Sequence, residues 1–217
     1  MSDRRWERLS PLTGIVAVAL WVIATVITEG AATTDADTPQ EMLAAYQDDT
    51  TAILSGSFLF MVGTAFFLWF LGSLRSRLFA AEGPPAHLSG IAFAGGIATA
   101  VCLLLMPAPH VAATINEDDL TAEAAHTLGT IDDAFFVGAE IAAIVLLVAT
   151  GLLALRTGVL PRWLGFVSLA IAVWLVIGPI GWLALLFAFP LWVILVSVLL
   201  MQRAGAEREL PAAGTTA

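Results

Sequence analysis

Long apolar runs separated by short polar segments are the dominant pattern along the chain. Several runs approach the roughly 20 residues that a helix needs to cross about 30 Å of hydrocarbon. They do not alternate between apolar and polar residues over about ten positions, as the strands of a membrane β-barrel do. The pattern therefore predicts an all-α, polytopic membrane protein.

Six spans are expected, within a single integral membrane domain that covers 1–217. The last apolar run, 164–201, is too long for one helix and is interrupted by "GPIG" at 178–181, so we interpret it as two helices joined by a tight turn. An even number of spans places both termini on one side of the membrane. The expected spans are 11–28, 51–74, 88–106, 134–155, 164–178 and 181–201, followed by a flexible tail at 202–217.

The charged residues indicate which side of the membrane each loop faces. All nine basic residues are arginine, and in the six-span arrangement every one falls on the face that carries the termini. Because cytoplasmic loops are enriched in arginine and lysine, this face is predicted to be cytoplasmic. Most acidic residues gather in two loops on the opposite face. We therefore expect a multi-pass protein of a bacterial inner membrane, with its acidic loops outside.

Composition narrows the class of protein. Hydrophobic residues make up 59% of the 217 residues and charged residues 12%, about half the charged fraction of soluble domains. A soluble catalytic domain and a nucleic-acid partner are not expected, whereas the lipid bilayer is the expected surrounding. The lack of lysine excludes a retinal Schiff base and a phosphate-loop lysine. The single cysteine, Cys102, excludes an internal disulfide.

The first apolar run is expected to remain as a membrane anchor. "MSDRRWER" would suit the start of a secretory signal, and "EGAATT" offers small residues for cleavage. The apolar stretch of about 18 residues nevertheless exceeds the usual 7–15 of a signal peptide. Its removal would also leave an odd number of spans.

Two short helices are predicted in the acidic loops. "TPQE" at 38–41 forms a capping box with proline at the first helical position. "LTAEAAHTLG" at 120–129 is expected to form a second short helix that ends at Gly129.

Small residues and prolines are expected to shape the bundle. Pro190 predicts a kink in the last span. The span 88–106 carries two rows of small residues that favour close helix contact. One row is Gly90, Ala94 and Ala98, and the other is Ala92, Gly96 and Ala100.

The loop "LRTGVLPRWLG" at 155–165 has a structural explanation at each position. Gly158 can end one helix in a left-handed cap, and Pro161 can open the next. Arg162 and Trp163 suit the inner membrane interface. The stretch resembles a loop in an uncharacterised family of six-helix bacterial membrane proteins, in which Arg, Ser or Thr, Gly, two residues and Pro-Arg precede Leu-Gly. The resemblance implies the same six-helix fold and carries no activity.

Glu140 is the charged residue that lies well inside a predicted span, about 9 Å from its outer end. A charge at the bilayer centre costs about 2.5–3.5 kcal/mol, so we expect this carboxyl to be protonated, paired or open to a wet pocket. Asp133 is two helical turns away on the same face. His126, His110 and Glu29 are expected on the same side of the membrane. Together these residues would suit a proton, a divalent metal or a cationic ligand, although a structural role for Glu140 is favoured.

Three functions follow from these expectations, and none of them names a cofactor. The preferred one is a small membrane protein without catalysis, which acts in binding, sensing or assembly, with a partner membrane protein or a second copy of the chain. The alternatives are a proton- or cation-coupled transporter that uses Glu140, and a membrane enzyme with an outer-facing metal site at His110, His126, Asp133 and Glu140.

Overall fold

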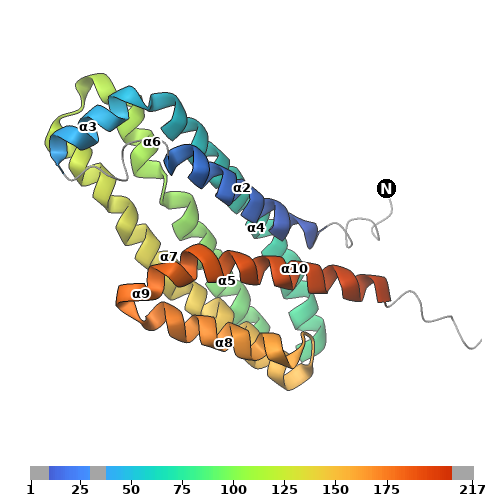
Figure 1. The fold of residues 1–217 in the computed structure, drawn as a ribbon. Helices are drawn as coiled ribbons and strands as arrows, with labels where there is room; N and C mark the ends of the chain where they lie inside the picture. Colours follow the sequence, from blue (N-terminus) through green and yellow to red (C-terminus); the bar gives the residue numbers. More distant parts are fainter. Residues whose placement is uncertain (1–9, 30–37, 207–217) are drawn as a thin grey trace, which may run out of the picture.

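The predicted all-α class is confirmed in the computed structural model, which describes residues 10–29 and 38–206 (Figure 1). The predicted tail begins inside the last helix, and its remaining residues, 207–217, lie outside the described ranges. The helices are α2 (Leu12–Glu29), α3 (Pro39–Asp48), α4 (Thr50–Glu82), α5 (His87–Leu105), α6 (Ala108–Ile115), η2 (Glu117–Asp119), α7 (Ala122–Thr157), α8 (Arg162–Val176), α9 (Gly178–Leu183), the π-helical turn η3 (Ala184–Ala188) and α10 (Phe189–Ala206).

Among the described residues, four helical segments are long and apolar enough to cross a membrane. They are Thr50–Glu82, His87–Ile115, Ala122–Thr157 and Ile180–Arg203. The other two expected spans correspond to shorter apolar helices, Leu12–Thr28 and Arg162–Val176. α8, with 15 residues, is only about 22 Å long.

The bundle has two ends (Figure 1), and the charged residues at them differ. One end consists of α3, α6, η2 and the first turns of α4 and α7, and we call it the acidic end. The opposite end holds the last turns of α4, α7 and α10 and the start of α8, and we call it the arginine end. The described carboxylates of the acidic end are Glu41, Asp48, Asp49, Glu117, Asp118, Asp119, Glu123, Asp132 and Asp133, and the described arginines of the other end are Arg75, Arg77, Arg156, Arg162 and Arg203.

Buried tryptophans connect neighbouring helices within the core. The indole N–H of Trp21 on α2 donates to the Thr64 hydroxyl on α4 at 3.0 Å. The indole N–H of Trp192 on α10 donates to the Ser168 hydroxyl on α8 at 2.8 Å. Since a buried indole N–H without a partner is costly, these bonds favour one relative position of each helix pair.

α5 packs between α4 and α7, and one of its two rows of small residues makes the contact. Ala92, Gly96 and Ala100 are buried, as are Gly95 and Thr99 beside them. The other predicted row is exposed, so its expected role in close packing is wrong within this chain. The exposed row consists of Gly90, Ala94 and Ala98.

Gly129 does not end a helix, and this part of the prediction is wrong. α7 continues through it from Ala122 to Thr157. A Cβ atom at Gly129 would lie 2.7 Å from Cε of Met42 on α3. The glycine therefore gives α3 room to pack on α7, although glycine inside a helix costs roughly 1 kcal/mol relative to alanine.

The chain reverses direction one residue earlier than predicted. α8 ends at Val176, Ile177 forms the turn, and "GPIG" begins α9. Proline suits this first helical turn because the amides there have no intrahelical partner in any case. The distortion expected at Pro190 is present as the π-helical turn η3, which ends two residues before it.

Local capping signals are confirmed. Thr38 and Glu41 form a capping box at the start of α3, with Thr38 N–H donating to Glu41 Oε2 at 3.0 Å. Gly158 ends α7 with φ +68° and ψ +13°, the left-handed conformation that glycine adopts without steric cost.

Candidate functional site

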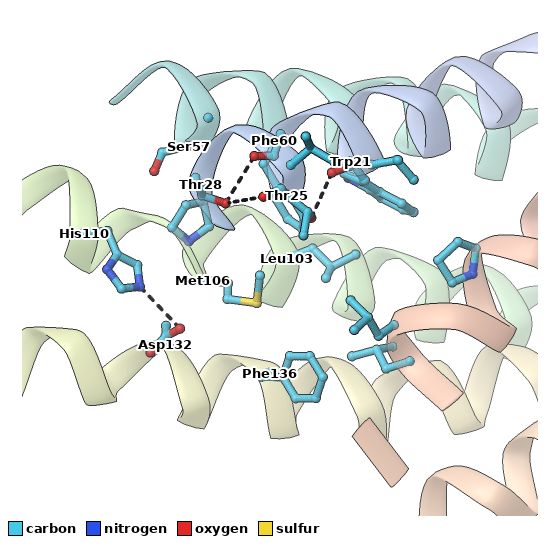
Figure 2. A pocket seen from close by; sticks show the side chains of 18 of the residues that line it. Trp21, Thr25, Thr28, Ser57, Phe60, Leu103, Met106, His110, Asp132 and Phe136 are labelled. Carbon is cyan, nitrogen blue, oxygen red and sulfur yellow. Dashed lines mark hydrogen bonds and ion pairs between the residues drawn. The ribbon is translucent and has the colours of Figure 1, made fainter. Parts of the chain in front are cut away.

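A cavity of about 680 Å³ lies between α2, α4, α5, α6, α7 and the η3–α10 segment (Figure 2). Its volume falls within the roughly 300–1,000 Å³ of typical small-molecule pockets. The helices that surround it come from both halves of the sequence, so the cavity forms only when the bundle assembles.

Aromatic and aliphatic side chains form most of the cavity wall. Trp21 and Phe60 stack with ring centroids 6.0 Å apart, one from α2 and one from α4. Leu103 on α5, Phe136 on α7 and Phe189 at the start of α10 complete this apolar part. An apolar ligand portion would bury surface against these groups, at roughly 25 cal/mol per Å² removed from water.

Polar groups line the cavity toward the acidic end (Figure 2). His110 Nε2 lies 3.3 Å from Asp132 Oδ2, which joins α6 to α7. The hydroxyls of Thr25 and Thr28 also line the cavity, but they donate to carbonyls of their own helix, at 3.0 Å to Trp21 O and 3.1 Å to Ala24 O. The His110–Asp132 pair is therefore the ionisable group best placed to meet a ligand.

The cavity reaches the outer surface of the bundle between α2 and η3. Val22 and Val26 on α2 line the cavity and are 55% and 64% exposed. Leu186 and Phe187 on η3 line it as well and are 41% and 62% exposed. The opening is thus bordered by large apolar side chains, which favours contact with lipid over water.

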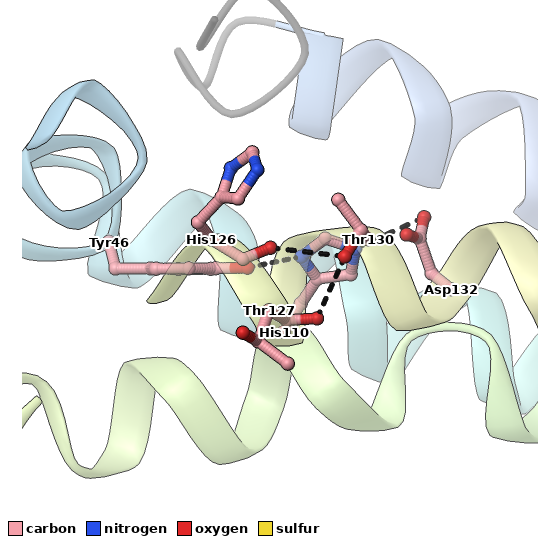
Figure 3. A network of polar contacts seen from close by, with 6 residues as sticks. All are labelled: Tyr46, His110, His126, Thr127, Thr130 and Asp132. Atoms are coloured by element: carbon pink, nitrogen blue, oxygen red, sulfur yellow. Dashed lines mark hydrogen bonds and ion pairs between the residues drawn. The ribbon is translucent and has the colours of Figure 1, made fainter. Parts of the chain in front are cut away.

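The second ring nitrogen of His110, Nδ1, also has a hydrogen-bond partner (Figure 3). The Tyr46 hydroxyl lies 2.9 Å from His110 Nδ1. A neutral imidazole with its proton on Nε2 would accept from Tyr46 and donate to Asp132, so both ring nitrogens are used. Burial, and secondarily the charge of Asp132, raise the pKa of Tyr46 above its ordinary range.

A small second core supports this arrangement at the acidic end. Tyr46 is fully buried in it, and its members come from α3, α4, α6 and α7. The buried residues of α3, Met42, Ala45 and Tyr46, have the helical spacing i, i+3 and i+4 and so form one face of the helix. Packing of this face in the small core holds α3, and with it Tyr46, in position. The buried members are Met42, Tyr46, Ile53, Ala113 and Ala125.

The predicted cluster is only partly assembled. His110 lies at the cavity, but its carboxylate partner is Asp132. Asp133 is exposed at the edge of the cavity. His126 lies on α7 apart from the His110–Asp132 pair (Figure 3), and its Nδ1 is buried without a hydrogen-bond partner among the described residues. The side chain of Glu29 is outside what the structure describes.

Glu140 lies deeper, beside the start of α9. Its Oε1 would be 3.2 Å from a Cβ atom at Gly181, and it has no hydrogen-bond partner within the described ranges. Along α7 it is eight residues from Asp132, about 12 Å. In the part of the chain that the structure describes, no three His, Cys, Asp or Glu side chains are grouped closely enough to hold a metal ion.

Tyr46 and Asp132 are the site residues that the sequence reasoning missed. A signal for Asp132 was present in the buried stripe of α7, where Leu153, Leu146 and Ala139 follow one another at seven-residue intervals. The next step of seven reaches Asp132, and not Asp133. For Tyr46, the spacing from Met42 already places it on the apolar face of α3.

Comparisons with protein families, curated protein sequences and solved structures find no match to this chain. The resemblance of the loop at 155–165 to an uncharacterised six-helix family therefore stays a prediction.

Proposed function

We propose that this chain is a six-span protein of a bacterial inner membrane that binds a small, largely apolar molecule in the cavity and catalyses no reaction. The proposal places the arginine end in the cytoplasm and the acidic end outside. All five described arginines lie at the arginine end and nine carboxylates lie at the acidic end, with Glu82 at the end of α4 as the exception, and this asymmetry supports the orientation. The shorter helices α2 and α8 would be the two additional spans.

The observation that carries the binding function is the cavity itself. It combines a volume of about 680 Å³ with an apolar wall and one His–Asp pair. This composition is typical of ligand pockets, in which a few polar groups orient a molecule that apolar contacts hold. The threonine hydroxyls at the cavity are bonded to their own helix, so they are not positioned as nucleophiles, and we propose binding without turnover.

Binding can be tested with a neutral fluorescent probe, N-phenyl-1-naphthylamine, and the protein in nanodiscs. We expect a saturable fluorescence increase above that of empty nanodiscs. Leu103→Trp places a larger side chain in the cavity and should weaken binding at least tenfold. Val101→Trp, on the exposed face of the same helix, should leave it unchanged. No saturable binding to the parent protein would refute the proposal.

A second pair of variants guards against loss of folding in the first. Thr25→Trp fills the cavity from α2, whereas Ile23→Trp changes an exposed position of the same helix that does not line the cavity. Unchanged probe binding in a cavity-filling variant that keeps the parent's melting temperature would place the binding elsewhere.

A proton-coupled carrier is the second candidate, and Glu140 is the residue that favours it. A carboxylate oxygen that is buried without a described partner, beside the break between α8 and α9, suits a group that gains and loses a proton. The carrier predicts proton flux in proteoliposomes that Glu140→Gln abolishes. Equal flux in parent and variant would eliminate it.

A further inference from the structure

The polar and apolar parts of the cavity lie at different depths. His110 and Asp132 are at the acidic end, whereas Leu103 and Phe136 are about one to two helical turns deeper (Figure 2). A ligand that is apolar throughout would leave the His–Asp pair without a counterpart. A molecule with a polar head and one apolar tail would match both parts.

The charge distribution selects the sign of the head. The described residues of the acidic end include nine carboxylates and neither lysine nor arginine. Exposed charges beyond about 8 Å are largely screened at physiological salt, so Asp132 and Asp133 at the cavity act most strongly. Their field attracts a cation and repels an anion.

The lateral opening indicates where such a molecule comes from. Val26 and Phe187 border it with exposed apolar surface, and in the proposed orientation this surface faces lipid. A membrane-resident amphiphile could therefore reach the cavity without passing through water. A two-chain phospholipid is larger than pockets of this volume usually accept, so one chain fits better.

We infer that the ligand is a single-chain amphiphile with a positively charged head group, held with its head at Asp132 and its tail between α2, α5 and α7. This inference rests on the proposed binding function. Asp132 would be shared between the head group and His110, and Tyr46 would keep the imidazole in place from the far side.

Three amphiphiles of equal chain length test the inference in nanodiscs of zwitterionic lipid. Dodecyltrimethylammonium, dodecanol and dodecyl sulfate compete with the bound naphthylamine probe, and each concentration is corrected for uptake by empty nanodiscs. We expect the cation to displace the probe at a concentration at least tenfold below that of dodecanol, and the sulfate to be the weakest.

Matched variants locate the effect. Asp132→Asn should reduce the cation preference at least fivefold and leave displacement by dodecanol unchanged. Asp119→Asn, at an exposed position of the acidic end away from the cavity, should retain the preference. Asp132→Glu keeps the charge and should retain most of it.

The outcomes separate the two proposals. If the probe does not bind the parent protein, the binding function itself fails. If the probe binds but the three amphiphiles displace it equally, or the sulfate is strongest, the cationic head group is refuted and the binding function stands. A cation preference that Asp132→Asn retains would also refute the assigned position of the head. Should Asp132→Asn fail to fold, the ranking on the parent protein still decides the sign of the charge.

Discussion

Alanine substitutions at two glycines of α5 should have opposite effects on stability. A Cβ atom at Gly95 would lie 2.7 Å from the backbone nitrogen of Leu146 and 3.0 Å from Cβ of Val145. Backbone inside a packed helix cannot yield as a flexible side chain does, so α5 and α7 must move apart. Overpacking of this kind costs about 1–3 kcal/mol. At Gly90 nothing lies within 4 Å of the added atom, and alanine in a helix is favoured over glycine by roughly 0.5–1 kcal/mol.

Gly96 provides an intermediate case. A Cβ atom there would lie 2.6 Å from the Leu71 side chain, whose end can shift. The predicted order of destabilisation is therefore Gly95→Ala, then Gly96→Ala, with Gly90→Ala neutral or stabilising.

Thermal unfolding in one detergent, followed by tryptophan fluorescence, measures this order. At about 2–4 °C per kcal/mol for a chain of this length, Gly95→Ala should lower the melting temperature by roughly 2–12 °C. Gly90→Ala should raise it slightly or leave it unchanged. A Gly95→Ala protein as stable as the parent would contradict the close α5–α7 approach and the reasoning built on it.

Two further predictions concern single side chains. Tyr46 is the only tyrosine, and burial, followed by the charge of Asp132, raises its pKa. Its phenolate absorbance should therefore be absent near pH 10, where a free tyrosine is half ionised, and Asp132→Asn should lower the pKa of Tyr46. An ordinary tyrosine titration in the parent protein would argue against the buried position. Trp192→Phe removes the buried hydrogen bond to Ser168 and should lower the free energy of unfolding by at least about 0.5–1.5 kcal/mol, measured by thermal or denaturant unfolding. Trp163→Phe, at a half-exposed position, should leave the free energy of unfolding nearly unchanged. Equal effects of the two substitutions would rule out a special role for the indole–hydroxyl bond.

Features that depend on a few neighbouring residues could be predicted from the sequence. The capping box at Thr38 and the left-handed cap at Gly158 were correct because each uses only residues within one helical turn. The expected all-helical class was correct for a similar reason. Long apolar runs leave the backbone few alternatives to a helix in a bilayer.

Features that depend on packing between helices could not be predicted in the same way. Gly129 carries an ordinary signal for a helix end, and its position against Met42 on α3, where a Cβ atom would clash, cannot be recognised from the neighbouring residues. The choice between Asp132 and Asp133 depends on a rotation of about 100° around α7, which the pair of aspartates alone does not reveal. The cavity requires six separate segments to meet, and no single segment contains its pattern.

Helix lengths connect the cavity to the position of Glu140. α7 has 36 residues, about 54 Å, whereas α8 has 15, about 22 Å. If the hydrocarbon begins near Arg156, Glu140 lies 16 residues away, about 24 Å, and Asp132 lies 24 residues away, about 36 Å.

In the proposed orientation, the two carboxylates would then lie on opposite sides of the outer boundary of a hydrocarbon layer about 30 Å thick. Glu140 is then level with the α8–α9 turn, in agreement with its contact at Gly181. A helix break leaves some amides and carbonyls without intrahelical partners, so the turn is more polar than lipid at that depth, although none of its described groups bonds to Glu140 Oε1. In the same placement Asp132 would lie just beyond the hydrocarbon, at the depth of lipid head groups, which is where the charged end of an amphiphile would be when its tail occupies the cavity.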